Sequence, residues 1–168
     1  MRNTGLVQTP ATRFLDAAGI AYEVFPYDHD PAASSFGLEA AEVLGLDPDV
    51  VFKTLMAEVH TSAQSRNELV VAIVPVSAKL DLKALARSAG AKRAAMASIP
   101  AAERSSGYVA GGISPFGQKK QLRTFVDETA EACDRIYVSG GQRGLDIGLD
   151  PAQLIASIDA TTAPIAAF

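Results

Sequence analysis

Apolar residues along the chain change repeatedly between helical and strand spacing, and this pattern predicts a mixture of short helices and strands. Helices are predicted where apolar residues recur every three or four positions after a capping residue, over residues 10–18, 38–44, 82–89, 98–106 and 151–157, with a helical turn over 128–132. Strands are predicted over residues 20–27, 50–57, 69–76, 91–97, 122–127, 135–138 and 143–149, with a hairpin loop over 61–67. Because several strands are joined by loops too short for a parallel crossover, we expect a mixed sheet in an α/β domain.

Length and composition indicate one folded domain. The chain has 168 residues, of which 48% are hydrophobic and 20% charged, and no long block of one charge sign occurs. Cys133 is the only cysteine, so no intramolecular disulfide can form and a reducing compartment fits best. No uninterrupted apolar run of about 18 residues is present. We therefore expect neither secretion nor a membrane span, and we predict a cytoplasmic protein.

The formal net charge of −4 argues against a protein that grips nucleic acid over its whole surface. A local patch remains open, because Lys119, Lys120 and Arg123 lie close together in the sequence, with Lys92 and Arg93 upstream. This group is either a solvated face or a landing site for a few phosphates at the end of a nucleic acid.

The glycine-rich stretch from Gly111 to Lys120 is the first candidate for chemistry. Its glycines allow backbone N–H groups to come close to a ligand, Pro115 stiffens the turn, and two lysines follow. Such a loop could cradle a carbonyl, a carboxylate or a phosphate. A tight structural turn explains the same residues equally well.

Lys53 is the most informative single residue, because it lies in the middle of an apolar strand pattern. Its ammonium group must reach solvent, pair with a carboxylate, or have its pKa lowered by desolvation, and a lysine that reaches solvent at a sheet edge is the commoner case. Asp146 alternates with Leu145 and Ile147 on another predicted strand, so it faces either water or a pocket. Ser139 is either a turn hydroxyl or a further polar group near Lys53.

Several familiar reaction centres are absent from the sequence. His29 and His60 are too few and too isolated for a metal site, and one cysteine cannot build a zinc site of the Cys-pair type. No Gly-x-Ser-x-Gly elbow, Walker-type motif or dinucleotide fingerprint occurs. Cys133 has no basic partner apart from Arg135 and is expected to be inert. The sequence thus offers no credible protein nucleophile, and we expect neither a metal nor a cofactor.

Several short motifs occur in order over nearly the whole chain. They are Tyr27-Asp28-His29-Asp30-Pro31, Phe36-Gly37, Phe52-Lys53-Thr54-Leu55, Leu80-Asp81-Leu82-Lys83, Ser106-Gly107-Tyr108 with residues 111–120, and residues 136–141 with 143–146. Together they resemble the YbaK family of Cys-tRNA(Pro) deacylases, which is similar to the editing domain inserted in bacterial prolyl-tRNA synthetases. The resemblance implies a flexible tail over residues 1–8 and a single α/β domain over residues 9–168, with a mixed, barrel-like β-sheet surrounded by short helices.

The resemblance also implies roles for individual residues. Lys53 matches the key catalytic side chain, and Gly111 matches the loop that holds the ester carbonyl or the terminal adenosine through backbone groups. Five further residues match positions that line the substrate pocket: Tyr27, Phe36, Thr54, Ser139 and Asp146. Candidates for contact with tRNA are Lys119, Lys120 and Arg123.

The implied reaction is editing, the release of a cysteine wrongly attached to the 3′ end of tRNA(Pro). The resemblance implies that the substrate thiol attacks its own ester carbonyl and releases a cyclic thiolactone, which fits a chain without a protein nucleophile. Aminoacylated tRNA(Pro) is the expected partner, and prolyl-tRNA synthetase is a further one that presents the substrate. Two alternatives stay open: an Ala-tRNA(Pro) or broader aminoacyl-tRNA deacylase, and a non-catalytic domain that binds tRNA or an amino acid.

Overall fold

The computed structural model describes residues 8–33, 35–61 and 66–168. The helices of these ranges are α1 (Pro10–Ala18), α2 (Phe36–Leu44), α3 (Leu82–Ala89), α4 (Ile99–Ser106) and α5 (Pro151–Ser157), with a 3₁₀ helix, η1 (Glu128–Ala132). The strands are β1 (Glu23–Pro26), β2 (Phe52–Thr61), β3 (Arg66–Pro75), β4 (Lys79–Leu80), β5 (Arg93–Met96), β6 (Thr124–Asp127), β7 (Ile136–Gln142), β8 (Leu145–Leu149), β9 (Thr161–Ala163) and β10 (Ala166–Ala167). Residues 1–7 of the predicted tail and 62–65 of the predicted hairpin loop lie outside the described residues.

The α-helices form where the sequence predicts them, because each begins at a residue whose side chain caps it. Thr9 accepts a hydrogen bond from the Thr12 backbone N–H at 3.1 Å, and Pro10 follows in the first turn. The other four caps are Ser35, Asp81, Ser98 and Asp150. Because Ser35 is a cap, α2 begins at Phe36, two residues earlier than predicted.

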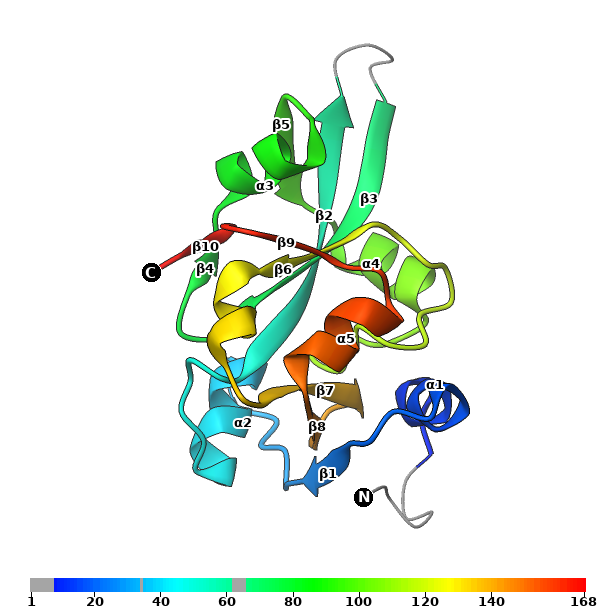
Figure 1. The fold of residues 1–168 in the computed structure, drawn as a ribbon, viewed down its shortest axis with the longest axis vertical. Helices are drawn as coiled ribbons and strands as arrows, with labels where there is room; N and C mark the ends of the chain where they lie inside the picture. Colours follow the sequence, from blue (N-terminus) through cyan, green and yellow to red (C-terminus); the bar gives the residue numbers. More distant parts are fainter. Residues whose placement is uncertain (1–7, 34, 62–65) are drawn as a thin grey trace.

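The largest sheet has five strands in the order β5-β2-β3-β6-β9 and is built around the long β2–β3 hairpin (Figure 1). β2 and β3 pair antiparallel from Phe52 opposite Pro75 to Thr61 opposite Arg66. β5 is also antiparallel to β2, whereas β6 and β9 join as parallel strands. The predicted mixed sheet is therefore confirmed.

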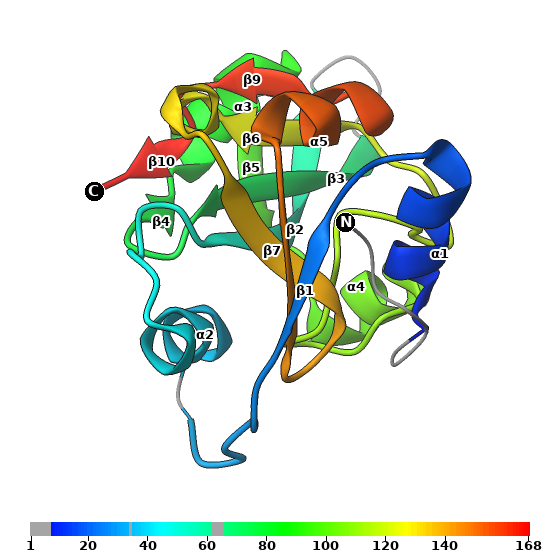
Figure 2. The ribbon, with the colours of Figure 1, turned by 60° about the horizontal axis from the view of Figure 1, so that its bottom comes forward.

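A second sheet, β1-β8-β7, is antiparallel throughout and lies at the end of the hairpin where β2 begins (Figures 1 and 2). An isolated bridge between Val51 and Tyr137 connects it with the start of β2. A barrel requires an unbroken ring of paired strands, and within the described residues β1, β5 and β9 each pair with one strand only. The single mixed α/β domain is as expected, but the sheet does not close, so the barrel-like description is corrected here.

Two clusters of buried apolar residues lie on opposite faces of the large sheet. Successive residues of a strand point to opposite faces, so Val71 and Ile73 of β3 belong to one cluster and Val70 and Ala72 to the other. The first cluster includes residues of α1, α4 and α5, and the second includes residues of α3. The two faces of the hairpin are therefore covered by different helices.

The last ten residues contain strands for which the sequence offered no signal. β9 joins β6, and β10 pairs with β4. Asp127, 2% exposed, accepts hydrogen bonds from the Ile165 and Ala166 N–H groups at 3.0 and 2.9 Å. A buried carboxylate thus holds the C-terminal segment against the sheet.

None of the helices in the described ranges has the length and apolar character needed to cross a membrane.

Candidate active site

A cavity of about 280 Å³ lies between α2, the start of β2 and the β1-β8-β7 sheet. Its lining includes every residue predicted to be catalytic or substrate-binding: Tyr27, Phe36, Lys53, Thr54, Gly111, Ser139 and Asp146. These residues come from separate parts of the chain, and the fold brings them together around one space. Ser35, Gly37 and Ile113 also line the cavity, and of these Gly37 and Ile113 were part of the sequence motifs without a predicted role.

Lys53 is half-buried near the start of β2. β2 is an inner strand of the sheet, but β5 pairs only with its residues 57–60, which leaves the side of β2 next to Lys53 open to the cavity. Burial lowers the pKa of Lys53, and the positive charge of Lys79 lowers it further. Among the described residues no carboxylate lies within the 4.0 Å of an ion pair. Of the alternatives open from the sequence, the structure shows the desolvated lysine.

Asp146, on β8, is the acidic residue of the cavity and is 6% exposed. Its strand pairs with both neighbours, which sets Asp146 opposite Phe25 of β1 and Ser139 of β7. Burial raises the pKa of Asp146 to about 7. Of the two orientations predicted, toward water or toward a pocket, the structure shows the pocket.

Three of the predicted residues contribute hydroxyl groups to the cavity, in addition to Ser35. Burial, followed by the charges of Asp146 and Glu39, raises the pKa of Tyr27 to about 12, so its hydroxyl stays protonated at neutral pH. Ser139 Oγ accepts a hydrogen bond from the Gly141 N–H at 3.2 Å, which is the turn bond expected for it, and Ser139 also lines the cavity. Thr54 Oγ1 is buried and has no hydrogen-bond partner in the described part of the chain, so it is available to a ligand.

Gly111 and Phe36 pack closely at one corner of the cavity. Gly111 has a φ of +85°, and a Cβ atom at this position would lie 2.9 Å from the Phe36 ring. The guanidinium group of Arg143 lies 4.9 Å from the centroid of the same ring, and its Nε donates to the Ala110 carbonyl at 2.8 Å. Phe36 thus connects α2 with the glycine loop, and Arg143 contacts both.

Arg143 and His29 are the neighbours of this corner that sequence reasoning missed. His29 was expected on the surface, yet its ring centroid lies 5.5 Å from that of Phe36, and its Nδ1 lies 2.8 Å from Glu39 Oε1. Arg143 appeared only within a motif. The available signal was its place directly before Gly144, in the two-residue turn between β7 and β8.

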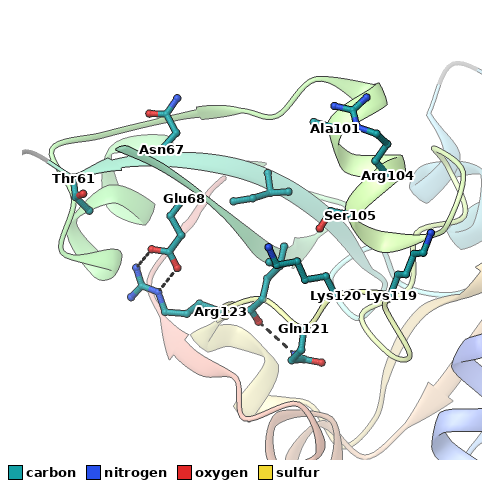
Figure 3. Close-up of a pocket in the computed structure, with 12 residues that line it drawn as sticks. Thr61, Asn67, Glu68, Ala101, Arg104, Ser105, Lys119, Lys120, Gln121 and Arg123 are labelled. Carbon is teal, nitrogen blue, oxygen red and sulfur yellow. Dashed lines mark hydrogen bonds and ion pairs between the residues drawn. The ribbon is translucent and has the colours of Figure 1, made fainter. Parts of the chain in front are cut away.

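The basic residues proposed for tRNA contact do not belong to this cavity. Lys119, Lys120 and Arg123 line a separate groove beside α4 (Figure 3). Arg123 forms a two-pronged ion pair with Glu68, in which its Nε and Nη2 each donate at 2.9 Å. Lys119 and Lys120 are exposed and form no ion pair with any described residue.

Cys133 lies away from the cavity and is half-buried. Burial and the negative charges of Asp134, Asp49 and Asp47 raise the pKa of its thiol, which keeps it protonated and agrees with the expectation of an inert residue. Within the described ranges no group of three His, Cys, Asp or Glu side chains is arranged to hold a metal ion.

Comparison with known proteins defines the class of this fold and site. Residues 29–156 match the aminoacyl-tRNA editing domain family, and this range covers most of the chain. The chain therefore belongs to that family of aminoacyl-tRNA editing enzymes, and the resemblance to YbaK-type proteins is confirmed.

Individual relatives agree with this assignment. The "Putative Cys-tRNA(Pro)/Cys-tRNA(Cys) deacylase EbsC" of Enterococcus faecalis (strain ATCC 700802 / V583) is 34% identical over 153 residues, which cover 89% of this chain and 87% of the relative. The crystal structure of "a putative trans-editing enzyme for prolyl tRNA synthetase" is similar with a TM-score of 0.78 and 21% identity, covering 96% of this chain and 99% of that one. The hypothetical protein APE2540 has a TM-score of 0.82 at 18% identity, with coverage of 94% and 99%. The two structures support the fold alone.

Proposed function

We propose that the protein removes cysteine from mischarged Cys-tRNA(Pro) in the cavity around Lys53. One observation carries this proposal: the cavity is lined by one cation, Lys53, and one anion, Asp146, that do not form an ion pair with each other. A cysteinyl ester brings a complementary charge for each, an α-ammonium group and the oxyanion that develops at its carbonyl. The name of the relative EbsC, which gives Cys-tRNA(Pro) as a substrate, supports the choice of amino acid.

The nucleophile of the proposed reaction is the thiol of the substrate. As a thiolate it attacks the ester carbonyl carbon, a C–S bond forms, and a tetrahedral oxyanion results. This intermediate collapses, the C–O bond to the ribose breaks, and the proton lost by the thiol is returned to the ribose hydroxyl. The products are a cyclic thiolactone and uncharged tRNA. No protein nucleophile is needed, which fits the remote and protonated Cys133 thiol.

Side chains of the cavity position the ester and stabilise charge in this scheme. The Lys53 ammonium group stabilises the oxyanion, and it does so strongly because its surroundings are desolvated. The backbone of the Gly111 loop and the ring of Phe36 hold the ester in an orientation from which the thiol can attack. Asp146, in its ionised form, binds the α-ammonium group, and the Thr54 hydroxyl offers a further hydrogen bond.

The thiol requirement supplies the specificity that the cavity cannot supply by size. A volume of about 280 Å³ suits a small amino acid, and it admits alanine as readily as cysteine. Binding alone separates residues that differ by one methylene only about 10–200-fold. Alanyl and prolyl esters enter but cannot cyclise, so Ala-tRNA(Pro) is expected to be a poor substrate.

The test is a deacylation time course with purified protein and tRNA(Pro) charged with cysteine, S-methylcysteine, alanine or proline. Rapid release is expected for cysteine alone, and S-methylcysteine is the control because it keeps the sulfur, adds one methyl group and cannot form a thiolate. Comparable rates for the alanyl and cysteinyl esters would point instead to an alanine-specific or broader deacylase. Binding of charged tRNA without release of any amino acid would identify a non-catalytic module.

Aminoacylated tRNA(Pro) and prolyl-tRNA synthetase are the proposed partners. With a net charge of −4, affinity for free tRNA should be weak and sensitive to salt, so the synthetase would help to present the substrate. A pull-down with synthetase in the presence of tRNA tests this, and a lack of association counts against it. Because charged tRNA is used in the cytoplasm, the same proposal places the protein there.

A further inference from the structure

Positive charge is concentrated in one segment of this acidic protein. Residues 79–123 contain nine of the fifteen lysines and arginines but only two of the nineteen aspartates and glutamates, which gives this segment a net charge of +7. The remaining residues carry a net charge of −11. Four of the nine cations lie together on one surface of the fold, which creates a local positive field that the overall charge of the protein conceals.

A groove of about 880 Å³, here called the α4 groove, is lined mostly by residues of this basic segment. It is formed by α4, by the loop before β6, and by the end of β2 with the start of β3. Figure 3 shows Arg104 on α4, Lys119 and Lys120 at the foot of the same helix, and the Glu68–Arg123 ion pair on the other side of the groove.

Three of the four cations that line the α4 groove are available to a ligand. Arg104, Lys119 and Lys120 are exposed and form no ion pair with any residue in the described part of the chain. Arg123 is different, because Glu68 neutralises it and its Nη2 also donates to the Ala89 carbonyl at 3.1 Å. The groove therefore offers a ligand three uncompensated cations. The charge of the fourth, Arg123, is already balanced by Glu68.

Uncharged polar groups lie among these cations. Ser105 Oγ is buried without a hydrogen-bond partner among the described residues, and Ser105 lines the groove. Asn67 uses its Oδ1 to bond His60 Nδ1 at 2.5 Å, which leaves its NH₂ group as a donor. Hydroxyl and amide groups of this kind bind phosphate oxygens and the 2′-hydroxyls of RNA.

The α4 groove is rigidly connected with the active-site cavity. The backbone N–H groups of Lys119 and Lys120 donate to the carbonyls of Ser106 and Ser105 at 2.9 and 3.2 Å, so the two lysines are fixed to the end of α4. The same loop carries Gly111 into the cavity. Thr61 of the groove and Lys53 of the cavity lie eight residues apart on β2. At 3.3 Å per residue this is about 26 Å.

We propose that the α4 groove binds the phosphate backbone of the tRNA acceptor stem while the 3′ end reaches the cavity at Lys53. The inference rests on the proposed function, since it takes a tRNA ester as the ligand of the cavity. The 3′-terminal nucleotides of a tRNA are single-stranded, so they separate the ester from the first phosphates of the double-stranded stem. The groove is likewise separated from Lys53, so stem and ester can occupy the groove and the cavity at the same time. Contacts of this type fix register without reading sequence.

The test compares two triple variants with equal loss of charge. The first, Arg104→Ala/Lys119→Ala/Lys120→Ala, empties the α4 groove. The second, Lys83→Ala/Arg87→Ala/Lys92→Ala, is the matched control, because these exposed cations lie around α3 and β5, and α3 covers the opposite face of the sheet from α4.

We expect the groove variant to bind uncharged tRNA(Pro) at least about ten-fold more weakly, with a plot of log K against log salt that is shallower by about 2–3. Its kcat/KM on Cys-tRNA(Pro) should fall to a similar extent, while its activity on the cysteinyl ester of a CCA trinucleotide, which has no stem, should match that of the wild type. The control variant should change tRNA binding less than about two-fold.

Glu68→Gln supplies a change of the opposite sign, because it releases Arg123 into the groove. Tighter tRNA binding with a steeper salt dependence is expected. Equal losses in both triple variants, or unchanged binding in the groove variant, would overturn the inference. So would loss of synthetase binding with tRNA binding retained, which would indicate an acidic protein surface as the occupant.

The proposed function can fail separately from this inference. If the wild type cleaves neither the tRNA ester nor the trinucleotide ester, the deacylase proposal fails, while the binding of uncharged tRNA still decides whether the groove is its docking surface.

Discussion

A Cβ atom at Gly111 would lie 2.9 Å from the ring of Phe36, closer than non-bonded carbon atoms approach in proteins. The loop therefore reaches α2 only with glycine at this position, and its φ of +85° is strained for any other residue. We expect Gly111→Ala to lower the free energy of unfolding by about 1–3 kcal/mol. Deacylation should fall at least about ten-fold because the wall of the cavity is displaced.

Gly90→Ala is the control for this prediction. Gly90 has a similar φ of +72°, but a Cβ atom there would meet nothing within 4 Å. The control should show comparable backbone strain in chemical denaturation and wild-type kinetics. If Gly111→Ala also retains wild-type kinetics, the loop does not shape the cavity.

Arg143 is expected to act as a positioning residue, because it contacts Phe36 and the Ala110 carbonyl together. Arg143→Leu removes both contacts and should raise KM about 3–10-fold with a smaller change in kcat, at a cost of about 1 kcal/mol of stability. Steady-state kinetics on Cys-tRNA(Pro) separate the two parameters.

Two further variants separate position from charge at Arg143. Arg143→Lys keeps the charge but lacks the planar guanidinium group with its several N–H donors, so its KM should stay raised. Recovery of the wild-type KM in this variant would mean that charge alone matters. Arg135→Leu is the control, since this half-buried arginine pairs with Glu23 away from the cavity and its loss should leave KM unchanged.

The parts of the fold that the sequence predicted are those encoded locally. Caps such as Thr9 and Asp81 fix where helices begin, and two apolar runs separated by a polar segment indicate the β2–β3 hairpin. β4, β9 and β10 have two or three residues each, too few for a periodic pattern, and depend on contacts such as those of Asp127. Whether the sheets close into a barrel depends on which edge strands pair with each other in the folded protein. Local sequence patterns do not encode this pairing.

For the candidate site, the sequence predicted which residues take part but not the environment of each one. Lys53 was recognisable because a charge within an apolar strand is anomalous, and the other lining residues came from motifs with a known order. The environment of each residue was not accessible. Asp146 turned out to face a pocket, and its alternation with Leu145 and Ile147 gave no sign of which face of β8 is covered. Arg123 turned out to be neutralised by Glu68, a residue 55 positions away.

Lys53→Met is expected to separate activity from stability. Burial lowers the pKa of Lys53, so its charged form is less favourable in the folded protein than in the unfolded chain. Replacement by an apolar side chain of similar length should leave the melting temperature unchanged or higher, while deacylation of Cys-tRNA(Pro) is lost. Lost activity together with an unchanged or higher melting temperature is the behaviour expected when a functional residue is replaced that lowers the stability of the fold.

Lys79→Met is the matched variant for Lys53. Lys79 is exposed, and its charge contributes to the lowered pKa of Lys53. Its removal should retain deacylation and extend activity slightly toward higher pH, since the pKa of Lys53 rises. Wild-type turnover by Lys53→Met would remove the ammonium group from the mechanism.

Asp146 should make both stability and activity depend on pH near neutrality. Burial raises its pKa from 3.8 to about 7, so the folded protein holds this proton more tightly than the unfolded chain does. The stabilisation is complete below about pH 4 and is lost as pH rises toward 7, which lowers the free energy of unfolding by about 2–4 kcal/mol across this window. Activity should change in the opposite direction, because only the ionised carboxylate binds the α-ammonium group of the substrate.

Asp146→Asn removes this titration and provides the measurement. Denaturation curves of the wild type and the variant at pH 5 and pH 8 should differ in their pH dependence by the amount that Asp146 contributes, with the variant relatively more stable at pH 8. Deacylation by the variant should be low at both pH values, whereas the wild type gains activity from pH 6 to 8. Asp134→Asn, an exposed change, should keep the wild-type profiles. Identical pH profiles of stability for the wild type and Asp146→Asn would contradict a buried, titrating carboxyl in the cavity, and unchanged activity would exclude it from substrate binding.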